Sequence, residues 1–563
     1  MNRPIATAEP FAEAGPAFAT HEVRNQAAPA LGFNAFTQDN ALRARVECGA
    51  PWAMAKCAAL GALAGDEALQ EAARLANAHD PVLRSHDRFG HRIDWVEYHP
   101  AWHQLMHAAF SNEVHSLAWT AKQPGAHFAR ATLSYLWNQV ENGVACPTGM
   151  AYAAVAGFEG RPEFAVWREK TLEADYDARR APVHAKRAAV IGYAMTEKQG
   201  GSDLRQTQTT AHALGAATGG GQAYSITGHK WFCSVPVADG FYTLAQTRSG
   251  VSCLFVPRVM PDGGNNRFFI QRRKDKCGNR SNASSEIEYH DTWALLVGEE
   301  GRGIREILSH AHLTRLDFAV GSAGLMRQAL TLAISHAQSR SGFGRPMAEL
   351  PMQANVLADL ALDSEAAMLS ALRVAAATDH IDDDEQERWF ARVATPVMKF
   401  WNCQRAPYFA SECVQVHGGN GFIMENPVAR LYREAPLNSI WEGTSNMMCM
   451  DVLRALGHEA GCRDAFVSEL QRQRGKDARM DKAVDDLARR LDQACADDGQ
   501  ARGVVTRMAY LLQAAQMLEH SPHAVADMFI RTRLGDDWMH VYGTLPASDD
   551  IPGIVARAAV VRH

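Results

Sequence analysis

The feature that most constrains the fold is a change of sequence pattern in the middle of the chain. Residues 191–297 are rich in Gly, Thr, Ser and Val and contain short alternating runs, such as Val251–Val256 and Phe268–Gln271. Alternation of this kind is typical of strands. On both sides of this stretch, apolar residues recur at helical spacing. The order helices, strands, helices predicts a mainly α chain of the α+β class with one β domain between helical parts.

The chain has 563 residues, which is more than one hydrophobic core accommodates, so several domains are expected. We expect a loose Ala/Pro-rich arm at residues 1–19 and a helical domain at 20–185. A β domain follows at 186–298 and a helical bundle at 299–456. The last domain, residues 457–563, is again predicted to be helical.

Smaller signals locate the ends of these elements. Tyr224–Thr227 follows three glycines, Gly219–Gly221, which predicts a hairpin turn before a strand. Glu286–Tyr289 is a further predicted strand. Gly321 and Gly324 lie in a helical stretch and are expected to allow close helix packing. Breaks in the helical pattern are expected at Pro51, Pro81, Pro100, Pro124, Pro147, Pro522 and Pro546.

Composition excludes several classes of protein. Hydrophobic residues make up 47% and charged residues 21% of the chain, and the net charge is −6, so there is no general attraction to nucleic acid or anionic membranes. Eleven cysteines without a C-x-x-C pair argue against a metal site or a disulfide framework. We find no signal-peptide pattern and no run of 18 apolar residues. These features predict a cytoplasmic protein without a metal ion and without a membrane partner.

One segment carries a chemically specific pattern. Residues 438–446 read Asn-Ser-Ile-Trp-Glu-Gly-Thr-Ser-Asn, which places Glu442 between Trp441 and a Gly-Thr-Ser turn. A neighbouring aromatic ring excludes water and raises the pKa of a carboxylic acid. A turn of this type brings backbone N–H groups and hydroxyls close to phosphate or ribose. The segment therefore favours a proton-abstracting carboxylate beside a phosphorylated cofactor, although a surface Glu before a turn gives the same local pattern.

Four further segments combine glycines with groups that bind flat or phosphorylated molecules. Residues 193–203 and 228–234 place hydroxyls and aromatics beside glycines, and residues 340–345 and 415–422 place Arg or Gln there. Each could also be an ordinary loop or strand end. No G-x-G-x-x-G follows a strand and opens a helix, so a Rossmann fold is not indicated.

Taken together and in this order, the segments resemble the acyl-CoA dehydrogenase family of flavoenzymes. The resemblance rests on Thr-Glu-x-x-x-Gly-Ser-Asp at 196–203, Lys-Trp-Phe-x-Ser at 230–234, Arg-x-x-Phe-Gly at 340–344, Gly-Gly at 418–419 and Glu-Gly-Thr at 442–444. Within the family, the chain resembles the alkylation-response branch, the AidB-like proteins. That resemblance spans roughly residues 20–540 and includes Asp-Lys-Cys-Gly-Asn-Arg-Ser-Asn-Ala-Ser at 275–284 and Arg-Leu-Tyr-Arg-Glu at 430–434.

The resemblance implies an acyl-CoA dehydrogenase-like fold in which FAD lies between the β domain and the bundle. Residues implied to contact the flavin from the β domain are Tyr193, Met195, Thr196, Gly201, Ser202, Phe232, Cys233 and Ser234. Residues implied to wrap its other side are Ile440, Trp441, Gly443, Thr444, Ser445 and Asn446. A third set is implied to reach the FAD of a neighbouring subunit in a homotetramer: Arg340, Phe343, Gln353, Gly418 and Gly419.

The implied reaction removes the α-proton of an acyl-CoA thioester with Glu442 while the flavin N5 accepts the β-hydride. Arg315 is implied to lie near this base in the substrate pocket, with an interhelical arginine as the alternative. Trp441 stands where the family usually has a smaller aromatic, and Phe232 stands where a Trp is more frequent. Both changes favour a second interpretation, a DNA-binding protective flavoprotein with little or no acyl-CoA dehydrogenase turnover.

The branch also implies a role in the response to DNA alkylation and binding of double-stranded DNA by the C-terminal domain. The candidate contacts are Arg454, Arg489 and Arg490. Residues 457–563 contain 14 Lys and Arg against 16 Asp and Glu, a net charge of −2. Nonspecific DNA binding needs several cations near phosphates. Charge alone therefore favours a solvated helix surface over a DNA-binding face.

Overall fold

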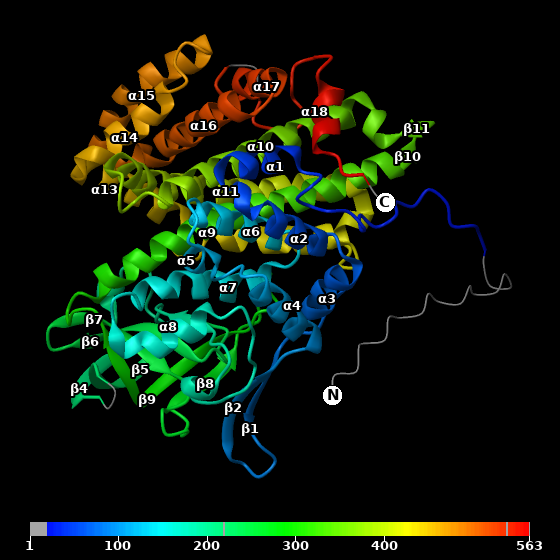
Figure 1. Ribbon diagram of the computed structural model, residues 1–563. Helices are drawn as coiled ribbons and strands as arrows, with labels where there is room; N and C mark the ends of the chain where they lie inside the picture. The colour runs from blue at the N-terminus through cyan, green and yellow to red at the C-terminus, as the bar shows by residue number, and fades with distance from the viewer. Residues whose placement is uncertain (1–19, 218–219, 536–538, 562–563) are drawn as a thin grey trace.

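The computed structural model describes residues 20–217, 220–535 and 539–561, so the arm expected at 1–19 lies outside the described residues. The molecule is layered (Figure 1). The β domain lies at the lower left, long helices cross the middle, and the C-terminal helices cover the bundle from above. The α+β, mainly α class predicted from the sequence is confirmed.

The N-terminal part is helical, with one hairpin that the sequence pattern did not predict. This hairpin, β1 (Val82–His86) with β2 (Arg92–Glu97), projects below the molecule (Figure 1). The helices are α1 (Asn40–Gly49), α2 (Met54–Ala64), α3 (Glu67–Ala78), α4 (Pro100–Ser111), α5 (Leu117–Thr120), α6 (Ala126–Trp137), α7 (Asn142–Ala154) and α8 (Ala165–Leu172).

The expected break at Pro147 is wrong, because this proline lies inside α7. A proline removes one helical hydrogen bond and crowds the preceding turn. All residues of α7 except Ala145 are buried, so packing on all sides maintains the helix through the proline. By contrast, Pro100 is the first residue of α4, where its missing N–H has no cost.

The β domain is a closed barrel. Its strands are β3 (Ile191–Ala194), β4 (Thr210–Ala216), β5 (Gln222–Ser234), β6 (Gly240–Thr247), β7 (Gly250–Pro257), β8 (Phe268–Arg273) and β9 (Ser284–Val297). Around the barrel, β6 pairs with β4, β4 with β5, β5 with β9, β9 with β7, and β7 again with β6. Two further strands pair at its side, β3 with β6 and β8 with β9. The pairing of β4 with β6 that closes the barrel is limited to Thr210 with Gln246. The four strand segments predicted from alternation all lie within β5, β7, β8 and β9.

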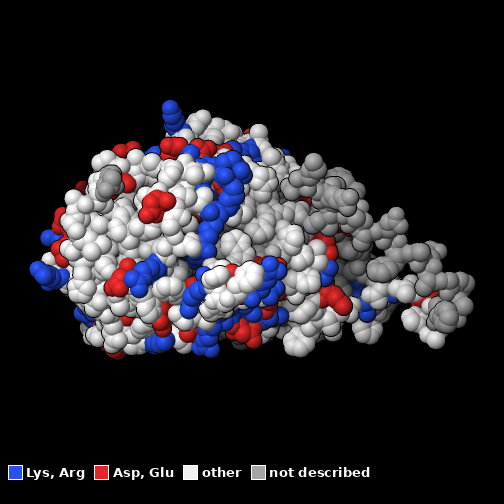
Figure 2. Space-filling model, turned by 90° about the horizontal axis from the view of Figure 1, so that it is seen from below, with Lys and Arg blue, Asp and Glu red and all other residues white. Residues whose placement is uncertain are grey.

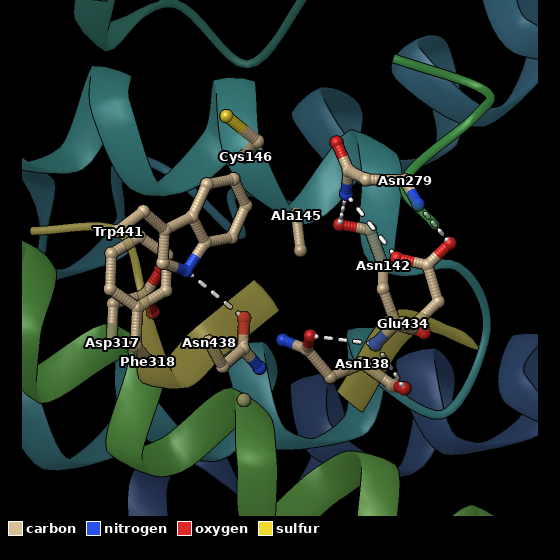
Figure 3. A pocket seen from close by; sticks show the side chains of 11 residues that line it. Asn138, Asn142, Ala145, Cys146, Asn279, Asp317, Phe318, Glu434, Asn438 and Trp441 are labelled. Atoms are coloured by element: carbon tan, nitrogen blue, oxygen red, sulfur yellow. Dashed lines mark hydrogen bonds between the residues drawn. The ribbon is translucent and has the colours of Figure 1, made fainter. Parts of the chain in front are cut away.

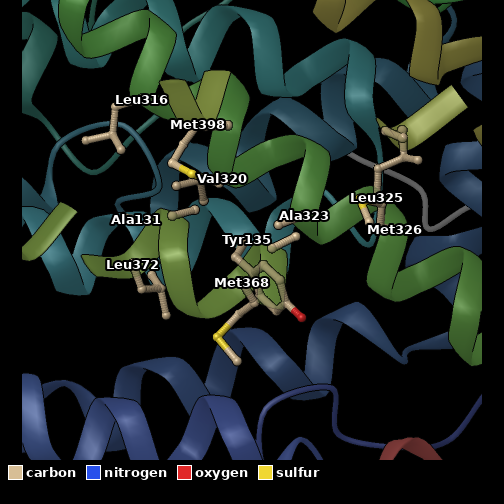
Figure 4. Packing of buried hydrophobic residues seen from close by; sticks show 14 of the residues in the cluster. Ala131, Tyr135, Leu316, Val320, Ala323, Leu325, Met326, Met368, Leu372 and Met398 are labelled. Carbon is tan, nitrogen blue, oxygen red and sulfur yellow. The ribbon is translucent and has the colours of Figure 1, made fainter. Parts of the chain in front are cut away.

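The bundle is built on α9 (Gly303–Ser339), α10 (Pro351–Thr378) and α11 (Glu385–His417), followed by α12 (Pro427–Glu434) and α13 (Ser445–His458). Figure 4 shows its core, where side chains from α6, α9, α10 and α11 interdigitate, among them Tyr135, Val320, Met368 and Met398. A Cβ at Gly324 would lie 2.4 Å from the carbonyl oxygen of Tyr135. This glycine allows the close helix packing predicted for it.

The C-terminal helices α14 (Ala460–Gln471), α15 (Ala478–Ala496), α16 (Ala501–His520), α17 (His523–Arg533) and α18 (Ile551–Ala558) lie on the bundle (Figure 1). Pro522 separates α16 from α17, as predicted. Buried ion pairs join the layers, such as Arg373 of α10 with Glu469 of α14 at 2.7 Å. Among the described helices, none has the length and apolar character needed to cross a membrane.

Candidate functional site

The loop that carries Glu442 has an unusual backbone. It connects a 3-10 turn, Ala435–Ser439, with α13. Glu442 has φ of +53° and Gly443 has φ of +105°. A left-handed conformation costs a non-glycine residue about 1–2 kcal/mol. At the φ of Gly443 any residue with a side chain is strained, which favours glycine there. Backbone strain of this kind is concentrated at functional sites.

Two cations, the buried Lys399 and the partly buried Arg315, hold this loop in place. Arg315 of α9 donates from Nε to the carbonyl oxygen of Glu442 at 3.1 Å and pairs with Asp451 at 2.9 Å. Lys399 of α11 donates to the carbonyl oxygen of Trp441 at 2.9 Å and also to that of Gly443. Three consecutive carbonyls are therefore fixed from two helices. Arg315, predicted in the substrate pocket, is thus bound to the backbone of the loop that carries Glu442.

The pKa of the Glu442 carboxyl is shifted by its surroundings, although the side chain is exposed in this chain. Burial raises the pKa of the Glu442 carboxyl above its ordinary value, while the charge of Arg315, hydrogen bonding by Thr314 and the charge of Lys399 act in the opposite direction. A raised pKa makes a carboxylate a stronger base. The backbone N–H of Glu442 has no hydrogen-bond partner among the described residues.

Trp441 has a fixed orientation beside the base. Its ring stacks on Phe318 of α9 with centroids 4.6 Å apart. Its Nε1 donates to Oδ1 of Asn438 at 3.1 Å. The indole therefore forms a permanent wall next to Glu442.

The end of β5 approaches the same place. Phe232 is 47% exposed, Ser234 is partly buried, and Cys233 between them is fully buried. Cys146 of α7 connects this strand end with the base: burial raises the pKa of its thiol, hydrogen bonding by Ser234 lowers it, and the charge of Glu442 raises it further. Phe232 and Ser234 are thus available to a ligand. The side chain of Cys233, predicted to contact the cofactor, faces the protein core instead.

A buried ion pair orders the loop at 195–203. Glu197 and Lys230 are both buried and lie 2.7 Å apart, and the Trp231 N–H donates to the carbonyl oxygen of Thr196 at 2.7 Å. A Cβ on Gly201 would lie 2.4 Å from Oγ1 of Thr196, so the glycine leaves room for this hydroxyl. The loop is thereby held against β5.

The remaining residues predicted in this loop region differ in accessibility. Ser202 is exposed. Tyr193 is partly buried, and its hydroxyl lies 3.1 Å from Nδ1 of His310. Met195 packs against the hydrophobic core of the β domain. Of the residues predicted to contact the cofactor in this loop, Thr196 and Ser202 keep accessible hydroxyl groups.

In the loop around Glu442, some predicted cofactor contacts are exposed and others are bound to the protein. Ile440 is 57% exposed, and Thr444 is exposed. Ser445 donates to Gln404 at 2.8 Å, and Asn446 accepts from Arg502 at 2.7 Å. The side chains of Ser445 and Asn446, predicted as cofactor contacts, are therefore bound to the protein.

The exposed groups fit a flavin. Phe232 and Ile440 offer apolar surface to a flat ring, and Thr196, Ser202 and Ser234 offer hydroxyls to its polar edge. Pockets that bind cofactors combine apolar walls with a few polar groups in this way. The residues present on this side of the site are therefore compatible with the FAD that the sequence predicts.

The third predicted set lies at the other end of the bundle. Arg340 follows the last residue of α9, and Gly418 follows the last residue of α11. The rings of His336 and His417 lie 4.5 Å apart, so these two helix ends are adjacent. At about 1.5 Å per residue, the 24 residues from Arg315 to Ser339 span about 36 Å. One chain therefore does not bring this set to Glu442.

At that far end, groups are open to a ligand. Phe343 is 97% exposed, and nothing lies within 4 Å of a Cβ built on Gly418 or Gly419. The Nε2 atom of Gln353 is buried without a hydrogen-bond partner among the described residues. These are properties expected of groups that bind a molecule outside this chain.

Two of the three candidate DNA contacts are paired with the same acidic side chain. Arg489 and Arg490 both pair with Asp486. Arg454, at the end of α13, is exposed. Figure 2 shows a band of Lys and Arg across the underside of the molecule, whereas the C-terminal helices lie on the upper side (Figure 1). A DNA-binding role for these three arginines stays a prediction.

Several residues of the site carry no local signal in the sequence. Thr314, Lys399, Asn438 and Cys146 come from four different elements, up to 296 positions from Glu442. Lys399 is the exception, because a lysine within the largely apolar helical run Val393–Phe400 is unexpected in the sequence. A charge on a buried helix face needs a partner, and here the partners are loop carbonyls.

The chain is similar to known proteins along most of its length. Family models match at residues 25–178 (Adaptive response protein AidB N-terminal domain), 192–292 (Acyl-CoA dehydrogenase, middle domain) and 301–457 (Acyl-CoA dehydrogenase, C-terminal domain). The AidB protein of Escherichia coli (strain K12) is 41% identical over 520 residues, which cover 92% of this chain and 94% of that protein. Acyl-CoA dehydrogenase family member 11 of Caenorhabditis elegans is 26% identical over 80% of this chain and 77% of its own.

Solved structures show the same fold. ACDH-11 of Caenorhabditis elegans in complex with C11-CoA superposes with a TM-score of 0.81 at 23% identity, over 96% of this chain and 93% of that one. An acyl-CoA dehydrogenase of Bacillus anthracis complexed with FAD superposes with a TM-score of 0.63 at 17% identity, over 82% and 86% of the two chains.

Proposed function

Because the chain belongs to the acyl-CoA dehydrogenase family of FAD-dependent oxidoreductases, as an AidB-like member, we propose that it oxidises an acyl-CoA or a related small thioester. The observation that carries this proposal is the left-handed Glu442, whose carboxyl pKa is raised and whose backbone is held by Arg315 and Lys399. A base on a rigid loop beside a flavin-compatible surface suits abstraction of a proton α to a carbonyl.

The residues of this chain would divide the work as follows. Glu442 takes the α-proton on its carboxylate. The unpartnered backbone N–H of Glu442 donates to the thioester oxygen, where negative charge develops as the proton leaves. Trp441 excludes water from the reacting carbons. Bound FAD supplies the acceptor for the β-hydride, and Phe232, Ser234, Thr196 and Ser202 would hold it.

A second copy of the chain is expected to complete the cofactor site. Arg340, Phe343, Gln353, Gly418 and Gly419 lie about 36 Å from the Glu442 end of α9 along the helix, at 1.5 Å per residue. Their open geometry suits contact with the FAD of a neighbouring subunit. We place the assembly, a homotetramer by family resemblance, in the cytoplasm, because all eleven cysteines are unpaired.

The test uses the purified, yellow protein. Anaerobic addition of short acyl-CoA thioesters should bleach the visible flavin band of the wild-type protein. In Glu442→Gln, bleaching should slow by about 10²–10⁴-fold, because general base catalysis contributes that much.

Glu299→Gln is the matched control, because Glu299 is exposed and pairs only with Arg302 across a turn. It should bleach at the wild-type rate. If no thioester bleaches the wild type, or if Glu442→Gln bleaches as fast as the control, the proposed reaction is wrong.

A further inference from the structure

A small cavity lies behind Trp441 and is lined mainly by polar side chains. Figure 3 shows Trp441 and Phe318 on one wall and the methyl group of Ala145 facing the middle. The opposite wall consists of amides and one acid, listed here in chain order: Asn138, Asn142, Asn279 and Glu434. The cavity volume of about 10 Å³ admits roughly one water-sized group.

This cavity adjoins the loop that carries Glu442. Trp441 is the residue next to Glu442 in the sequence, and its ring lines the cavity. Cys146 also lines it and interacts with both Ser234 and Glu442. The proposed route for a group bound beside Glu442 and the end of β5 runs past Cys146 and Trp441, which both line the cavity.

Asn142 leaves an unsatisfied hydrogen-bond acceptor in the cavity. Both side-chain N–H groups of Asn142 are used, toward the backbone oxygen of Asn138 at 3.2 Å and its Oδ1 at 3.0 Å. The Oδ1 atom of Asn142 is buried without any partner. The two carboxyl oxygens of Glu434 accept only from Asn279, at 2.7 and 3.4 Å. A ligand that donates a hydrogen bond would satisfy the amide oxygen.

An alkyl chain is poorly suited to this place. Leaving a buried acceptor unsatisfied costs about 1–3 kcal/mol, whereas burying one methylene gains about 0.8 kcal/mol. Among the described residues, the apolar groups of the cavity are confined to the wall formed by Trp441 and Phe318 and to Ala145. The balance favours a polar end group over a methyl group.

We propose that the substrate is a short acyl thioester with a hydroxyl group at the end of its acyl chain, beyond the β-carbon, which donates to Oδ1 of Asn142. This inference rests on the proposed function. The α-hydrogen leaves as a proton to Glu442, the β-hydrogen leaves with its electron pair to the flavin, and a double bond forms between the two carbons. The hydroxyl group is unchanged by the reaction and serves for recognition.

The test compares two thioesters of equal length by calorimetric binding to the flavin-loaded protein: butyryl-CoA and the analogue with a hydroxyl group on its fourth carbon. Wild-type protein and Glu442→Gln should both bind the hydroxylated thioester at least about 10-fold more tightly, since one recovered hydrogen bond is worth about 1.4 kcal/mol or a factor of ten. Equal binding, tighter binding of butyryl-CoA, or binding of neither thioester would overturn the inference.

Two variants test the assigned contact. Asn142→Leu removes the amide oxygen and should abolish the preference for the hydroxylated thioester. Because that variant changes a buried hydrogen-bond network, Ala145→Val provides a second test: it fills the cavity, leaves every polar group in place and should reduce the preference as well. Retention of the full preference in both folded variants would contradict the assignment.

The two hypotheses fail in different ways. If the hydroxylated thioester binds preferentially but no thioester bleaches the flavin, the proposed oxidation is wrong and the recognition inference stands. If butyryl-CoA bleaches the flavin and binds as well as its hydroxylated analogue, the oxidation stands and the cavity holds only a water molecule.

Discussion

At the scale of single residues, the loop at Glu442 shows why part of the site is readable from the sequence and part is not. The Trp-Glu-Gly-Thr pattern is local, so Glu442 could be predicted from its neighbours. Its supports are distant: Arg315 lies 127 positions away and Lys399 43 positions away, on two different helices. Each of these two is one charged residue within a long helical pattern, and only packing reveals that loop carbonyls are its partners.

The pH dependence of protein stability tests the protonation of Glu434, which lines the cavity. Burial, as the largest cause, raises the pKa of its carboxyl from 4.5 to about 7, helped by the charge of Glu141. The folded state therefore favours the protonated acid, and this stabilisation is fully present below about pH 4.5 and is lost as pH rises through 7. Between about pH 5 and pH 8 the free energy of unfolding should fall in both proteins. We expect the fall in Glu434→Gln to be smaller than that in the wild type by about 1–3 kcal/mol.

The measurement is the free energy of unfolding in denaturant at both pH values for the two proteins. Only the change between pH values is compared, so a constant cost of the substitution cancels. Glu425→Gln, an exposed residue nearby, should follow the wild type. An identical pH dependence in wild type and Glu434→Gln would contradict the buried, protonated acid.

At the scale of elements, the C-terminal helices are fixed to the bundle by buried ion pairs. Arg533 of α17 is fully buried and contacts Asp359 and Asp363 of α10, the latter at 2.8 Å. Removing one partner of a buried pair leaves an uncompensated charge, which costs about 3–5 kcal/mol. Arg533→Met should therefore lower the free energy of unfolding by about that amount.

The matched control is Arg490→Met on α15. Arg490 is exposed and lies 3.4 Å from Asp486, and exposed pairs contribute about 0–1 kcal/mol. Thermal and denaturant unfolding of both variants would measure the difference. Equal losses in the two variants would mean that the ion pairs do not fix the C-terminal helices.

Elements were predicted well where one periodicity dominates. The barrel strands alternate, and the bundle helices repeat at helical spacing over 28 to 37 residues. The hairpin β1–β2 was not predicted because its strands are short and Arg and His interrupt their apolar residues. Pro147 was misread because the packing that overrides a proline comes from segments distant in sequence.

At the scale of the whole molecule, the two halves of the predicted cofactor site lie at opposite ends of the bundle. The order of the helical and β parts was readable from the sequence, but which residues face each other across subunits was not. Exposed apolar residues gather at the far end, including Phe343 at 97% and Phe422 at 78% exposure. Exposed apolar patches indicate interaction sites, and a second copy of this chain is the proposed occupant.

Charging this end should separate the subunits. The double variant Phe343→Glu with Phe422→Glu should sediment at a lower mass than wild type and lose flavin on gel filtration, because the proposed second half of each cofactor site would be removed. Phe89→Glu, at the tip of the β1–β2 hairpin and 71% exposed, is the matched control and should do neither. A variant that keeps its mass and its flavin would contradict the shared site.

The length of α9 has one more consequence. Its first half carries Arg315 beside the base, and its last residue precedes Arg340. In the proposed assembly, each such helix would serve two different reaction centres with its two ends. Two chains that are each inactive, one damaged at Glu442 and the other at Arg340, could then complement each other, because a mixed particle would contain one centre built entirely from undamaged parts.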